Sequence, residues 1–162
     1  MDLIDFISIL SRSVFTWPRI LLNRVWHPIP YLERRVLETA EDFILQDYLP
    51  IYREQISCIN YAQRQFQRTV LFEWKFPGRF NWQRNQYFEP LKGQNKVVNY
   101  EIEFENGKKL HGNILADDGV ICNVTHGEWP GYFKKTKIKI IRIRKGSIVD
   151  RKKVKAHMSS MS

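Results

Sequence analysis

The chain has 162 residues, a length typical of a single domain with room for a hydrophobic core. Hydrophobic residues make up 43% and charged residues 27% of it, as in ordinary globular proteins, and the net charge is +9. A membrane-spanning helix is excluded because Arg12, Arg19 and Arg24 interrupt the only long apolar run. Asp2 and Asp5 stand where a signal peptide needs positive charge, so we expect a cytoplasmic protein.

The first 60 residues have the three- and four-residue apolar spacing of helices. Pro18 cannot donate a backbone hydrogen bond, so it divides the first pattern into helices over 2–15 and 17–26. Two further helices are predicted over 30–47 and 50–60.

From Gln67 the apolar period changes to two, which is typical of strands. The first strand is predicted over 67–76, and residues 78–95 form a long loop that includes one short strand near Tyr87. Asn106-Gly107 predicts a type I′ turn, and Asp118-Gly119 a second turn. The remaining predicted strands are Lys96 to Glu105, Leu110 to Ala116, Val120 to His126 and Thr136 to Arg144.

The alternation slips in the last strand, where Ile138 and Ile140 have one parity and Ile141 and Ile143 the other. A β-bulge at Ile140–Ile141 would return the isoleucines to one face. A strand covered on both faces is the alternative.

Helices followed by hairpins predict an α+β fold, with N-terminal helices packed on one face of a twisted antiparallel sheet of about five strands. We expect one domain over 1–146, with helices in 2–60 and the sheet in 67–145. Residues 147–162 are polar and basic and are predicted to be a disordered tail.

Positive charge is concentrated at the C-terminal end of the chain. Residues 1–133 carry 15 basic and 16 acidic side chains, whereas residues 134–162 carry 11 basic side chains and only Asp150. Such a stretch can bind phosphates, or it can protect an edge strand from aggregation. The candidate nucleic-acid-binding residues are Lys137, Lys139, Arg142, Arg144, Lys145, Arg151, Lys152 and Lys153.

Three glutamates, Glu101, Glu103 and Glu105, share one face of a predicted strand. Clustered histidine or aspartate ligands are missing from the neighbouring segments, so a metal site is not predicted. We expect these carboxylates to pair with lysines at 109, 137 or 139 on adjacent strands.

No catalytic residue, metal ligand or cofactor is predicted. Cys58 and Cys122 lack metal-ligand spacing, and we expect two reduced thiols. His126 is four residues after Cys122, on the same strand face but two pleats away, which is too far for proton transfer.

A loop rich in arginine and aromatic residues precedes the hairpins. Arginine, tryptophan and tyrosine are enriched in interface hot spots, although the same side chains can cover the end of a sheet. The candidate partner-binding residues are Arg79, Trp82, Arg84, Tyr87, Phe88 and Trp129. The N-terminal helix is expected to pack on the domain or on a second copy of the chain.

Tyr52-Arg53-Glu54-Gln55-Ile56, followed later by Asp118-Gly119-Val120 and Trp129-Pro130, resembles a family of small, uncharacterised bacterial proteins. The resemblance implies a compact α+β domain and attaches no activity to it. By analogy of type, such domains are similar to immunity proteins of bacterial toxin systems.

The sequence therefore favours a non-enzymatic protein-binding module of a bacterial cell, such as an immunity protein that occludes a toxin. Nucleic-acid binding through the basic strand and tail is the alternative hypothesis.

Overall fold

The computed structural model describes residues 29–59, 61–65, 68–73, 87–89, 91–133 and 136–160. The helices predicted over 2–15 and 17–26 lie outside the described residues, as does most of the loop 78–95. The short strand predicted near Tyr87 is absent from the described part of that loop.

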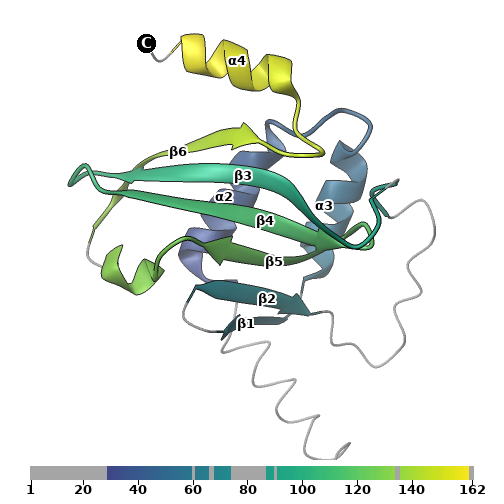
Figure 1. Cartoon of the computed structure of the whole chain (residues 1–162), viewed down its shortest axis with the longest axis horizontal. Helices are drawn as coiled ribbons and strands as arrows, with labels where there is room; N and C mark the ends of the chain where they lie inside the picture. Colours follow the sequence, from purple (N-terminus) through teal and green to yellow (C-terminus); the bar gives the residue numbers. More distant parts are fainter. Residues whose placement is uncertain are drawn as a thin grey trace, which may run out of the picture.

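The described residues form an α+β fold, as the sequence predicts (Figure 1). The sheet is antiparallel and has six described strands rather than about five, in the order β1-β2-β5-β4-β3-β6. The additional strand is β1, which pairs with β2 directly after the helices. The strands are β1 (Tyr61–Gln65), β2 (Thr69–Glu73), β3 (Gln94–Phe104), β4 (Lys109–Asp117), β5 (Val120–His126) and β6 (Ile138–Lys145).

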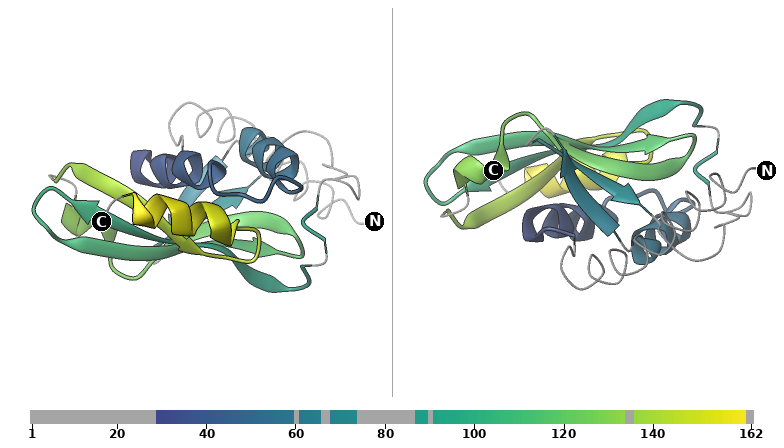
Figure 2. Two further views of the ribbon diagram at one scale, coloured as in Figure 1. Left: turned by 90° about the horizontal axis from the view of Figure 1, so that it is seen from above. Right: turned by 90° about the horizontal axis from the view of Figure 1, so that it is seen from below.

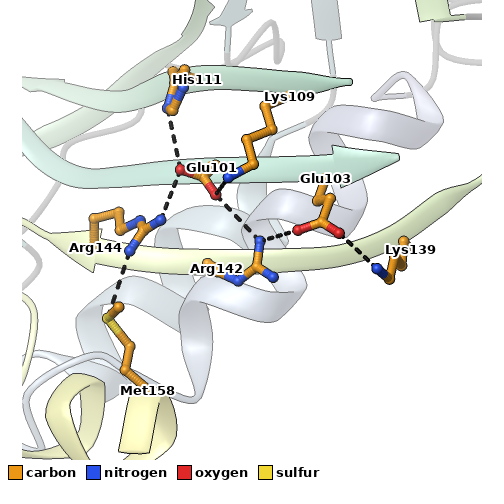
Figure 3. A network of polar contacts seen from close by, with 8 residues as sticks. All are labelled: Glu101, Glu103, Lys109, His111, Lys139, Arg142, Arg144 and Met158. Carbon is orange, nitrogen blue, oxygen red and sulfur yellow. Dashed lines mark hydrogen bonds and ion pairs between the residues drawn. The ribbon is translucent and has the colours of Figure 1, made fainter. Parts of the chain in front are cut away.

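Helices α2 (Tyr31–Glu41) and α3 (Leu49–Cys58) lie on one face of this sheet (Figure 2). Both helices are shorter than predicted. Val36, Leu37 and Ala40 of α2 belong to the same buried core as the inward side chains of the strands. The opposite face of β3, β4 and β6 carries charged side chains (Figure 3). The sheet therefore has one apolar face, which packs on the helices, and one polar face.

Two tight turns set the register of β3, β4 and β5. Asp118 and Gly119 have φ values of 45° and 80°, which is the pair of positive values that a type I′ turn requires. The other turn differs from the prediction, because Gly107 alone is left-handed, with φ 77°. The Asn106 side-chain oxygen instead accepts a hydrogen bond from Lys108 N at 3.0 Å, which stabilises a longer connection.

The predicted bulge of the last strand is present but lies earlier. Ile141 is opposite Ile102 and Ile138 is opposite Phe104, with a register shift that leaves Lys139 as the extra residue. Ile138 and Ile141 therefore face the core together. Ile140 lies opposite Glu103 on the polar face.

The disordered tail predicted for 147–162 is wrong, because Arg151–Ser159 form helix α4. The Asp150 side chain caps this helix by accepting a hydrogen bond from Lys152 N at 2.8 Å. Val154 is 6% exposed, and Val149 forms a β-bridge with Ile44. Capping and apolar contacts thus fold a segment whose composition is polar and basic.

Candidate functional site

The predicted partner-binding residues do not form one surface. Arg79, Trp82 and Arg84 lie outside the described residues. Tyr87 is half-buried, but Phe88 is fully buried and cannot contact a partner, which corrects the prediction for that residue. Two contacts hold Phe88 in the core. Its ring packs edge-on against Tyr48, and its backbone N–H donates a hydrogen bond to Gly119 O at 3.0 Å.

Trp129 lies at the other end of β5 from this contact. Gly119 precedes the seven-residue strand, and Trp129 follows it after two residues. At the rise of an extended chain, the strand alone separates the two sites by roughly 20 Å. A partner that contacts both Tyr87 and Trp129 must therefore span the length of β5.

The Trp129 pocket is a cavity of about 860 Å³ where the start of α2 meets the end of β3 and the connection from β5 to β6. The connection includes the short 3₁₀ helix η2 (Pro130–Phe133). Phe133 stacks on Phe104 with 4.4 Å between ring centroids, which fixes the floor of the cavity. The apolar lining consists mainly of Tyr31, Leu32, Phe104, Trp129, Pro130 and Phe133.

A cavity of this size with mostly apolar walls is typical of a binding site. Tyr31 is 71% exposed, and the only other exposed large apolar side chain of the described residues is Met158, at 41%. Tyr31 therefore gives the pocket an exposed aromatic rim within the described part of the chain.

Three charged residues also line the pocket: Glu33, Arg64 and Lys137. Glu33 has no exposed surface, and its Oε1 is 2.6 Å from Arg64 Nη2. The Arg64 side chain remains 31% exposed, and Lys137 is exposed. A ligand in the pocket would consequently meet positive charge and not the carboxylate.

Behind the pocket, Glu33 belongs to a buried hydrogen-bond network. His126 Nε2 is 2.8 Å from Glu33 Oε1, and the Tyr100 hydroxyl is 2.9 Å from His126 Nδ1. Burial alone would raise the pKa of Glu33, but the hydrogen bond from His126 and the charges of His126 and Arg64 lower it below its usual value. The ionised Glu33 thus accepts from Nε2, while Nδ1 shares a hydrogen bond with the Tyr100 hydroxyl.

This arrangement resembles a proton relay, yet Glu33, His126 and Tyr100 are almost completely buried. Burial, with the nearby charge of Glu33, raises the pKa of Tyr100 well above its usual value, so the phenol stays protonated. Tyr100 is 2% exposed and His126 is 2% exposed. The network therefore links α2 and β1 to β5 and β3 through side chains that are almost completely buried. Sequence spacing gave no signal for it, because 93 residues separate Glu33 from His126.

Gly112 makes the network sterically feasible. It lies opposite both Tyr100 on β3 and His126 on β5. A Cβ atom at this position would be 2.2 Å from the Tyr100 hydroxyl oxygen. The missing side chain leaves the space in which Tyr100 crosses β4 to reach His126.

The polar face of the sheet carries a second network, centred on Glu101 (Figure 3). Glu101 is 4% exposed and lies 2.7 Å from Arg144 Nη2 and 3.2 Å from Arg142 Nη1. Lys109 also pairs with Glu101, and Lys139 pairs with Glu103, as the sequence predicts. No ion pair of Glu105 or of Lys137 is among the described contacts.

These ion pairs change the predicted nucleic-acid site. Lys139, Arg142 and Arg144 are held by carboxylates, and a phosphate would have to displace them. The exposed candidates without a described ion pair lie at the pocket rim, at the end of β6 and on α4, namely Lys137, Lys145, Arg151, Lys152 and Lys153.

The Glu101 network predicts a loss of stability in acid. Burial raises the pKa of Glu101, but the hydrogen bond and charge of Arg144, with Lys109 and His111, lower it below 4.5. Since this pKa is lower in the folded chain, the network stabilises fully above about pH 4.5, and the contribution disappears as pH falls through the folded pKa. We expect Arg144→Met to lose less stability than the parent chain between about pH 5 and pH 3.

Thermal unfolding of both chains as a function of pH measures this difference. Arg53→Met, which removes an exposed pair with Glu41, serves as the control and should follow the parent profile. Parallel acid profiles for the parent and Arg144→Met would contradict the assignment.

Comparisons with protein-family models, with curated proteins and with solved structures return no match. None of the described helices is long and apolar enough to cross a bilayer. Within the described ranges, no group of three or more histidine, cysteine, aspartate or glutamate side chains is arranged to hold a metal ion.

Proposed function

We propose that the protein is a non-catalytic binding module that receives an apolar anchor of a partner protein in the Trp129 pocket. The observation that carries the proposal is the contrast between two neighbouring sites. The pocket is open, aromatic and about 860 Å³ in volume. The Glu33–His126–Tyr100 network behind it is the most relay-like group of the described residues, and its three side chains are almost completely buried.

An immunity protein that occludes a toxin is the form of this function that we favour. Trp129, which the sequence singles out for partner binding, lines the pocket beside the exposed Tyr31. Aromatic anchors in such pockets supply much of the binding energy in protein interfaces. Nucleic-acid binding remains the alternative proposal, with less support because three of its predicted residues are engaged by Glu101 and Glu103.

Substitution of Tyr31 tests the proposal. Tyr31→Gln should weaken binding of the partner by roughly 5- to 30-fold, because it removes an interfacial aromatic worth about 1 to 2 kcal/mol. Met158→Gln is the matched control, since Met158 is also a large, exposed apolar residue but lies on α4. The measurement is affinity capture from the source cell with quantitative mass spectrometry, followed by titration of the captured protein against each variant.

A stoichiometric partner that binds Met158→Gln as tightly as the parent chain and Tyr31→Gln more weakly would support the proposal. If no such partner is recovered, or if both variants retain it equally, the proposal is wrong. A captured toxin should also lose its effect on growth when the parent chain is co-expressed with it.

A further inference from the structure

We infer that the partner segment bound by the Trp129 pocket is acidic and places a carboxylate beside its apolar anchor. This inference rests on the proposed function and specifies the chemistry of the partner. The inference is based on which charged side chains of the pocket are accessible to a ligand.

The walls of the pocket offer a ligand cations but no accessible anion. Lys137 is exposed, and none of the described carboxylates pairs with it. Arg64 is 31% exposed although it contacts Glu33, whereas Glu33 itself has no exposed surface. A carboxylate next to the anchor would meet Lys137, while a basic group would meet the like charge of Lys137.

The charge of the rest of the molecule also favours an acidic partner. The chain has a net charge of +9, so its field attracts an acidic partner and raises the association rate. Charge on the polar face of the sheet is largely compensated by the Glu101 and Glu103 pairs. The pocket thus combines an apolar site with the charge of Lys137, for which no ion pair is seen among the described residues.

A charge reversal at Lys137 tests the inference. Random 12-residue peptides displayed on phage are selected on the parent full-length chain and on Lys137→Glu. Peptides selected on the parent chain should carry a large apolar residue flanked by aspartate or glutamate. A representative synthetic peptide should bind Lys137→Glu at least about tenfold more weakly, because the rim charge then repels it.

Lys92→Glu is the control, since Lys92 is exposed beside the start of β3, away from the pocket. It makes the same change in net charge and should reduce the affinity far less than Lys137→Glu does. Equal losses in the two variants would overturn the inference, because they would indicate attraction to the whole molecule rather than to the pocket rim.

The outcomes distinguish the inference from the proposed function. Apolar peptides without carboxylates that bind the parent chain but not Tyr31→Gln would overturn the inference and leave the binding function intact. Peptides that bind the parent chain and Tyr31→Gln equally, or an absence of selected peptides, would overturn both. Acidic peptides that lose affinity in Lys137→Glu support the inference.

Discussion

Replacing His126 by leucine is expected to lower the free energy of unfolding by about 3 to 5 kcal/mol. Leucine keeps most of the side-chain volume but removes both ring nitrogens. Glu33 then keeps only its contact with Arg64, and the Tyr100 hydroxyl loses its described partner. The buried carboxylate would keep one partner fewer and the buried phenol none of its described partners, and denaturant titration of the parent and variant chains measures that cost.

The same substitution on the neighbouring strand provides a control. The His111 side chain is 67% exposed and lies on the polar face, 3.7 Å from Glu101. His111→Leu should change stability by less than about 0.5 kcal/mol, as surface substitutions usually do. Similar losses in the two variants would show that the buried network does not stabilise the fold in the way we describe.

The second large effect is expected at Gly112. Gly112→Ala should destabilise the chain by about 3 kcal/mol, since overpacking of a dense core forces side chains and backbone apart. Its Cβ would lie 2.2 Å from the Tyr100 hydroxyl oxygen and 2.6 Å from Thr125 O. The second contact is with backbone in the adjacent strand, so rotation of the tyrosine alone cannot relieve the clash.

Gly127→Ala is the matched control for this steric argument. The nearest atom to a Cβ at that position is His111 O at 3.5 Å, an ordinary van der Waals distance. Thermal unfolding should therefore separate the two alanine variants clearly. Equal melting temperatures would contradict the close approach of Tyr100 to β4.

The hairpins were predictable because their signals are local. Alternation in β3, β4 and β5 places each side chain on a face without knowledge of the rest of the chain. Asp118-Gly119 likewise specifies a two-residue turn within the sequence that forms it. The bulge in β6 was also foreseeable from the change of parity among its isoleucines, although its location depends on pairing with β3.

Two elements were missed for different reasons. Strand β1, Tyr61–Gln65, is short and polar and becomes a strand by pairing with β2. Helix α4 had a local signal in its capping residue, Asp150, but its basic composition outweighed that signal. A further contribution is the burial of Val154, which composition does not reveal.

The candidate site was the least predictable part. Trp129 was identified from its residue type, but the pocket also needs the start of α2, Arg64 of β1 and the end of β3. Tertiary pairing alone brings these segments together. The contacts of His126 were unpredictable for the same reason, because its partners Glu33 and Tyr100 lie on other elements of the fold.

The way in which the C-terminal helix is anchored limits how the basic segment can be studied. Asp150 N donates to Phe43 O at 2.8 Å, and Ile148, Val149 and Val154 are all buried. Deletion of the chain from Gly146 would remove these residues from the interior and expose the surfaces that they cover. Loss of nucleic-acid binding in such a truncated chain would therefore not separate the loss of positive charge from damage to the fold. Full-length chains in which exposed lysines of α4 are replaced by glutamine keep the interior intact and isolate the contribution of charge.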